Sequence, residues 1–203
     1  SPIAASPDAA SEELASPFPA SPIPFDPEMF RNDPERNGQA AGPGPIETTA
    51  IEEIWSFDAG GDVQSSPVVV DGVVYFGSAD GSVYGVDSVT GEPNFRFRTE
   101  SRIFSSPAVV DGKVLIGAEN GILYALDATS GEELWGFQTG DTILASPAVV
   151  DGIVYIASYD DKLYALNLDD GSELWSFTGS SSFYASPAVS NGMIFIGGVD
   201  GVF

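Results

Sequence analysis

The side chains of this chain that could do chemistry are almost all carboxylates. Its 203 residues include 30 Asp and Glu and seven Lys and Arg, but no Cys and no His. Without a thiol or an imidazole, the chain cannot build the common nucleophile–base pairs, Cys/His zinc sites, His-ligated haem or a disulfide. The sequence therefore predicts a protein that acts through binding surfaces, with no catalytic residue, and not an enzyme.

One group of polar side chains, Tyr159, Asp160 and Asp161, places an aromatic ring next to two carboxylates. Such a group could bind a sugar, and together with Asp169 and Asp170 it could hold calcium. The same positions in neighbouring parts of the chain carry turn-forming Asp, Asn and Gly residues. We therefore expect these carboxylates to shape turns and a solvated acidic rim, and we predict no bound metal.

The charge balance restricts the possible partners. The net charge of -23 would repel a phosphate backbone over a long range, so nucleic acid is not an expected partner. No apolar run approaches the ~18 residues that a membrane span needs, so we predict no transmembrane segment in this chain. The charge fits a solubility role in a salty or extracellular setting.

The elements that must position these side chains follow a repeat. A Ser-Pro dipeptide recurs every 40 residues, and this spacing fixes the register of everything between the copies. A period of about 40 residues with β-type patterning is typical of propeller blades, because one small sheet cannot bury both faces alone. The dipeptides are Ser66-Pro67, Ser106-Pro107, Ser146-Pro147 and Ser186-Pro187.

Each unit reads as four antiparallel strands joined by tight turns. In the second unit we expect strands at 106–110, 113–118, 122–127 and 133–138. The Asp-Gly and Asn-Gly pairs between them supply the positive φ angles that short hairpins need. The predicted fold class is all-β, a β-propeller of four-stranded antiparallel blades.

The number of repeats raises a question of ring size. The chain holds an outer strand around Trp55, three full units, and a fourth that reaches only the start of its third strand at Phe203. We expect these units to be part of a larger ring, because a ring stopped inside a strand leaves backbone groups unpaired. Two half-rings that pair, or a small closed ring, are the alternatives.

The first 50 residues differ from the rest. They hold ten of the fifteen prolines, and proline fixes φ and removes hydrogen-bond donors, so this segment favours extended structure. We expect residues 1–50 to form a Pro/Ala/Ser-rich arm and residues 51–203 to form the repeats. Apolar side chains such as Phe18, Phe25 and Phe30 would fasten the arm to a partner protein or to the propeller itself, and we expect the partner.

The end of the third strand carries a denser motif. A small residue, an Asp or Asn, a Gly and a Trp stand at fixed offsets, and this pattern resembles the tryptophan-docking motif of PQQ-like, quinoprotein-type propeller repeats. In that motif the small residue makes room for the indole, Gly takes a left-handed conformation, and Trp joins one blade to the next. The matching residues are Ala125, Asp127, Gly131 and Trp135 in one unit and Ala165, Asn167, Gly171 and Trp175 in the next.

The first unit departs from this pattern. Phe95 stands where Trp is expected and Pro93 precedes it, so we expect a looser outer edge there. The resemblance also implies that the leading strand with Trp55 completes the last blade and closes the ring, which removes exposed sheet edges.

The resemblance implies a function for the loops between blades. The chain is similar to the non-enzymatic branch of the family, to which the propeller lipoprotein of the bacterial outer-membrane β-barrel assembly machine belongs. We therefore expect an extracytoplasmic scaffold or accessory subunit that binds other proteins of a membrane-associated or cell-surface complex, held at a membrane, if at all, through a segment outside this sequence. Apolar pairs at equivalent loop positions would form the docking patch, unless one member of each pair plugs the blade interface. These are Ile103, Phe104, Ile143, Leu144, Phe183 and Tyr184.

Two other functions stay open at this point. The enzymatic branch of the family consists of PQQ- and calcium-dependent dehydrogenases, which typically place a vicinal disulfide beside the quinone and basic residues in the channel. This chain has no Cys, and its lysines, Lys113 and Lys162, fall at strand starts, so neither PQQ nor calcium is expected. The third possibility is a ligand-sensing or carbohydrate-binding ectodomain.

Overall fold

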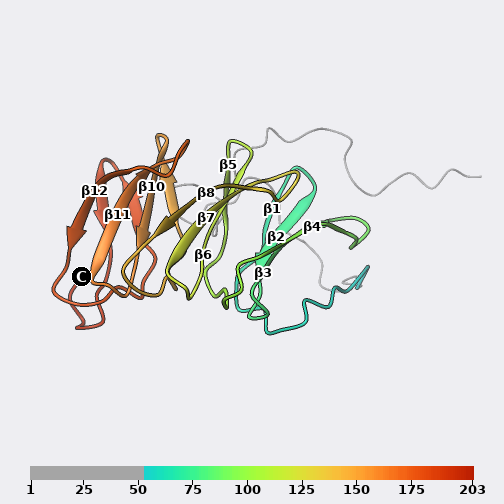
Figure 1. The fold of residues 1–203 in the computed structure, drawn as a ribbon, viewed down its shortest axis with the longest axis horizontal. Coiled ribbons are helices and arrows are strands. Elements are labelled where there is room, and N and C mark those ends of the chain that lie inside the picture. The colour runs from blue at the N-terminus through green and yellow to red at the C-terminus, as the bar shows by residue number, and fades with distance from the viewer. Residues whose placement is uncertain (1–52) are drawn as a thin grey trace, which may run out of the picture.

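The computed structural model of the protein describes residues 53–203, and all of its regular elements are β-strands. Three four-stranded antiparallel sheets follow one another along the chain, each with its strands in chain order. Figure 1 shows these sheets side by side, from β1 to β4 at one end to β12 near the other. Blade 1 consists of β1 (Val68–Val70), β2 (Val73–Gly77), β3 (Ser82–Asp87) and β4 (Pro93–Arg98); blade 2 of β5 (Ala108–Val110), β6 (Lys113–Gly117), β7 (Ile122–Asp127) and β8 (Glu133–Gln138); blade 3 of β9 (Ala148–Val150), β10 (Ile153–Ala157), β11 (Lys162–Asn167) and β12 (Glu173–Thr178).

The hairpins between the first two strands of each blade form because their turns accept positive φ angles. Asp71, Asp111 and Asp151 have φ of 49°, 48° and 51°, and a glycine with positive φ follows each of them. Two successive left-handed residues make the hairpin turn whose twist matches the flanking strands. The Asp-Gly pairs therefore set the register of each blade, as the sequence predicts.

The innermost strands are shorter than expected, and proline is the reason. The second unit was expected to begin its first strand at residue 106, but β5 begins at Ala108, after Pro107. Proline has no N–H for a ladder, and the N–H of Ser106 is already used, because it donates to Oγ of Ser146 at 2.8 Å. Ser66 and Ser146 make the same bond to Ser106 and Ser186, at 2.9 Å each. The Ser-Pro repeat is thus a ladder of bonds between adjacent blades, which we call the serine ladder.

The apolar core lies between the blades. Leu115 and Leu123 of blade 2 pack in one buried cluster with Val154 and Ile156 of blade 3. A second cluster joins Val68, Tyr75 and Val83 of blade 1 to Val114 and Ile116 of blade 2. The middle strand β6 is therefore covered on both faces, as its run of apolar residues requires.

Aromatic pairs repeat the same contact at the outer side of each interface. Phe97 of blade 1 meets Tyr124 of blade 2 edge to face with ring centroids 5.4 Å apart. Phe137 and Tyr164 repeat this contact between blades 2 and 3 at 5.2 Å. Phe57, which precedes blade 1, makes it with Tyr84 at 5.1 Å. Residues 53–62 therefore occupy the place of a preceding outer strand.

The fourth unit contributes two paired strands, β13 (Ala188–Ser190) and β14 (Met193–Phe195), within the described residues. An isolated bridge joins Phe183 to Gly198. The segment around Trp55 was expected to be an outer strand, but it has no strand assignment, because no inner strand lies beside it to pair with among residues 53–203. The predicted arm, with Phe18, Phe25 and Phe30, lies outside the described residues, and the helix-free part described here has no segment that could cross a membrane as a helix.

Candidate protein-interaction site

A hollow next to the serine ladder collects one residue from each repeat. Its lining includes Gln64, Phe104, Leu144 and Tyr184, which stand 40 residues apart, and its volume is about 480 Å³. Ser186, the last serine of the ladder, also lines it. The 40-residue register thus brings together three side chains of the predicted docking patch that are far apart in sequence.

The two members of each predicted apolar pair have different environments. Ile103 and Ile143 are completely buried, and Phe183 is 5% exposed. Ile143 packs so closely on Gly117 that a Cβ there would lie 2.2 Å from its Cγ2, and Ile103 meets Gly77 in the same way. The first residue of each pair therefore plugs the blade interface, and the second lines the hollow.

The hollow becomes more open towards blade 3. Phe104 and Leu144 are partly buried, whereas Tyr184 is 62% exposed. The ring of Tyr159 meets that of Tyr184 edge to face, with centroids 6.3 Å apart. Aromatic side chains such as Tyr and Phe are enriched at protein interfaces. Chemically, this site can bury an apolar side chain of another molecule.

The carboxylates near Tyr159 are engaged in the fold. Asp160 accepts hydrogen bonds from the hydroxyl of Tyr164 and from the N–H of Gly140, the latter at 2.7 Å. Burial and this carboxylate together raise the pKa of Tyr164 well above its ordinary value. Oδ1 of Asp161 accepts from the hydroxyl of Ser182 at 2.7 Å.

The other two candidate calcium ligands also have local partners. Asp170 accepts from the N–H and the hydroxyl of Ser172, at 3.0 and 2.6 Å, and these bonds lower the pKa of its carboxyl. Asp169 pairs with Lys113 at 3.4 Å. Within residues 53–203, no three His, Cys, Asp or Glu side chains gather as a metal site would require.

The predicted docking motif lies at the blade interfaces. The indole of Trp135 packs against Gly171, where an added Cβ would lie 2.5 Å from Cε3, and its N–H donates to the carbonyl of Leu168 at 3.1 Å. Ala165 is completely buried and pairs in the sheet with Trp175, as Ala125 pairs with Trp135.

Of the other aromatic residues of the motif, Phe95 and Trp55 are packed in the same way, and Trp175 is not. Phe95 packs on Gly131 and is 8% exposed, so the outer edge of blade 1 is as well covered as that of blade 2, and only the indole hydrogen bond is missing. Trp55 packs on Gly91 and donates to the carbonyl of Ser88 at 3.0 Å. Trp175 remains 40% exposed, because no following blade covers it in the described part of the chain.

The acidic or amide position of the motif shapes a turn. Oδ1 of Asp127 accepts from the N–H groups of Ser130 and Thr129, at 2.7 and 3.0 Å, and these bonds lower the pKa of its carboxyl. Oδ1 of Asn167 accepts from the N–H of Asp169 at 2.7 Å. An acceptor is all that this position needs, which is why Asp and Asn are interchangeable there.

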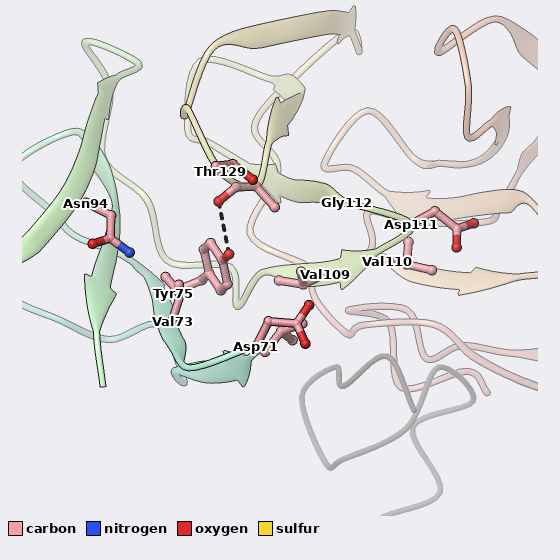
Figure 2. A pocket seen from close by; sticks show the side chains of 11 residues that line it. Asp71, Val73, Tyr75, Asn94, Val109, Val110, Asp111, Gly112 and Thr129 are labelled. Carbon is pink, nitrogen blue, oxygen red and sulfur yellow. Dashed lines mark hydrogen bonds between the residues drawn. The ribbon is translucent and has the colours of Figure 1, made fainter. Parts of the chain in front are cut away.

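Sequence reasoning missed two parts of these surfaces. Gln64 lines the hollow and stands 40 residues before Phe104, but its polar side chain departs from the apolar pattern at the equivalent positions. A second cavity lies between blades 1 and 2, next to Tyr75 (Figure 2). No motif marks it, because its lining residues come from strands and turns of two different blades.

Stacked four-stranded blades joined by docked aromatic rings define a β-propeller of PQQ-like repeats. Residues 49–145 and 119–203 match the family model described as "Outer membrane protein assembly factor BamB", and the chain belongs to this family. None of the curated proteins matches the chain.

Solved structures show the same fold. BamB from Moraxella catarrhalis aligns with a TM-score of 0.63 at 20% identity, over 70% of this chain and 49% of that one. The computationally designed protein Ika4 aligns with a TM-score of 0.67 at 19% identity, over 75% and 95%. Quinohemoprotein alcohol dehydrogenase from Comamonas testosteroni aligns with a TM-score of 0.53 at 27% identity, over 58% and 21%. This chain thus spans about half of the Moraxella protein.

Proposed function

We propose that this protein is a non-catalytic, extracytoplasmic β-propeller scaffold or accessory subunit that binds other proteins in a membrane-associated or cell-surface complex. The observation that carries the proposal is the hollow lined by Phe104, Leu144 and Tyr184. The repeat places an apolar or aromatic side chain at one equivalent position in three consecutive units, where the fold itself does not require it.

The contrast with the adjacent residues supports this interpretation. The packing of the blades uses Ile103, Ile143 and Phe183, which are buried. The next residue in each case faces the hollow, where polar side chains would cost the fold little. Apolar side chains at such positions are typical of a surface that another protein covers.

The family supports the setting of the proposal. Its description names an assembly factor for outer membrane proteins, and the scaffold role and the extracytoplasmic location are the corresponding inference for this chain. In this interpretation residues 1–50, with Phe18, Phe25 and Phe30, form an additional arm that engages the same complex.

The test compares two sets of substitutions in the full chain. Phe104→Ser, Leu144→Ser and Tyr184→Ser together remove the lining of the hollow, whereas Ile143→Ser removes one interface plug. The triple variant should lose the proteins that co-purify with the native chain from its own cell envelope and keep a melting temperature close to native. Ile143→Ser should melt lower, since emptying a buried aliphatic site costs about 2–5 kcal/mol. A triple variant that melts lower while its partners stay bound would refute the docking function.

The likeness to a quinohemoprotein alcohol dehydrogenase favours one second candidate, a quinoprotein function. Adding PQQ and calcium to the purified chain tests it directly. A change in visible absorption together with a higher melting temperature would support a quinoprotein, and the scaffold proposal expects neither.

A further inference from the structure

A cavity of about 610 Å³ opens between blades 1 and 2, at the end of the innermost strands away from the serine ladder. Its aliphatic walls come from both blades and include Val70, Val73, Val109 and Val110. Figure 2 shows Tyr75 next to the turn that carries Thr129, with the hydroxyl of Tyr75 hydrogen-bonded to that turn. Aliphatic walls of this kind suit a chain of methylene groups.

The polar groups of the cavity leave a negative rim. Asp71 and Asp111 line it from the two hairpin turns, and both side chains are exposed. Asn94 adds an amide, which points towards Tyr75 in Figure 2. The hydroxyl of Tyr75 is already bonded, because it donates to the carbonyl of Ala128 at 3.0 Å. A ligand here would meet carboxylates at the mouth and valines below them.

The next interface of the same protein has a lysine at the position equivalent to Val73. Forty residues on from Val73 stands Lys113, and forty on from Thr129 stands Asp169. Nζ of Lys113 crosses from blade 2 to the Asp169 carboxylate of blade 3, at 3.4 Å, and its side chain is only 17% exposed. At that interface the protein supplies its own alkylammonium group. Between blades 1 and 2, Val73 stands at the position of Lys113 and Thr129 at the position of Asp169, so this ion pair is replaced by two uncharged side chains.

We propose that the cavity between blades 1 and 2 binds a lysine side chain of a partner protein. The methylene stem lies along the valines, and the ammonium group lies at the rim that carries Asp71 and Asp111. Lysine side chains bind in this way, with the stem on apolar surface and the charge towards water or a carboxylate. The cavity shares no lining residue with the hollow, so the two sites can be tested separately.

The test titrates the full chain, observed by amide NMR, with the peptide acetyl-Gly-Lys-Gly-amide and with its norleucine counterpart. Binding of the lysine peptide should shift the amides of Gly72, Gly112 and Thr129, and the norleucine peptide should not bind. Asp71→Asn with Asp111→Asn should weaken binding by about 2- to 30-fold, since each exposed charge pair contributes about 0.2–1 kcal/mol. Asn keeps the left-handed turn conformation, so the fold is preserved.

Two further variants decide the matter. Val73→Lys with Thr129→Asp installs the ion pair of the neighbouring interface, so the protein fills its own cavity and should no longer bind the peptide. Asp151→Asn removes the same charge from an equivalent turn and should leave binding unchanged. Shifts spread over all acidic turns, or binding that survives the self-filling variant, would overturn the proposal. Binding of n-butylammonium but not of the lysine peptide would also overturn it, because the site would then take free amines only.

Discussion

The backbone N–H of Ser106 donates to Oγ of Ser146, 2.8 Å away and 40 residues further along the chain. The serine of one blade thus completes the hydrogen bonding of the blade before it. Proline follows each serine and offers no N–H, so the serine amide is the last donor before the innermost strand.

The first prediction concerns this serine ladder. Ser146→Ala removes the acceptor of a buried N–H, and leaving such a group unsatisfied costs about 1–3 kcal/mol. We expect urea unfolding to show this loss of stability. Ser176→Ala, which removes an exposed hydroxyl that donates to Glu173 in its own strand, is the matched control. Equal stability of the two variants would mean that the ladder contributes nothing.

The second prediction separates a docked indole from an undocked one. Trp135 is 9% exposed and packed on blade 3, and Trp175 is 40% exposed. Trp135→Ala should cost about 3–5 kcal/mol, as for other buried aromatic side chains, and Trp175→Ala clearly less. Trp135→Phe keeps most of the packing and loses only the bond to Leu168, about 1 kcal/mol. Equal losses at both tryptophans, measured by urea unfolding, would contradict the docking role.

The third prediction concerns the glycine under the indole. Gly171 and Gly152 have φ of 70° and 75°, so alanine at either place adopts a left-handed conformation that costs about 1–2 kcal/mol. Only at Gly171 would the new Cβ meet another group, 2.5 Å from the Trp135 ring. Gly171→Ala should therefore destabilise the protein more than Gly152→Ala, where the space is open. The difference between their melting temperatures measures the contact alone.

The fourth prediction concerns Asp80 and pH. Burial opposes ionisation of this carboxyl, but hydrogen bonds from the Tyr84 hydroxyl at 2.7 Å and from Ser82 outweigh it, so the pKa of Asp80 is lowered. A lowered pKa in the folded state means that the ionised carboxylate stabilises the fold above the pKa of the unfolded chain, about 3.9. This contribution disappears as the pH falls below that value and through the folded pKa.

Asp80→Asn tests this linkage. The variant should be less stable than the native protein at pH 7, and the gap should narrow as urea titrations move below pH ~4. Tyr84→Phe removes one of the donors and should reduce the pH dependence without abolishing it. A gap between Asp80→Asn and the native protein that stays constant from pH 7 to pH 3 would contradict the assignment.

The sequence predicted the blades well because turn chemistry repeats with them. Asp-Gly pairs demand positive φ, and the indole motif has a fixed spacing, so most strand boundaries followed from local residues. The expected strand at residue 106 was wrong because the competing bond of its N–H comes from Ser146, in another blade. A single sequence does not show which side chain meets an amide across an interface.

The candidate site was predictable only in part. The spacing identified Phe104, Leu144 and Tyr184 as equivalent, but their separation from the buried Ile103 and Ile143 depends on which way each loop turns. The cavity at Val73 was not predictable, since it is the space that Val73 and Thr129 leave unfilled between blades 1 and 2. Such a space is visible only once the blades are packed.

In the serine ladder, each serine N–H bonds to the equivalent serine of the next blade. The indole of Trp135 likewise bonds to a residue of the next blade, Leu168. Duplication of one 40-residue stretch of the gene would therefore insert a unit whose two flanks already fit the existing neighbours. A propeller held together by contacts between adjacent blades can therefore change its number of blades by recombination. Sites such as the Val73 cavity can still diverge at one interface without affecting the others.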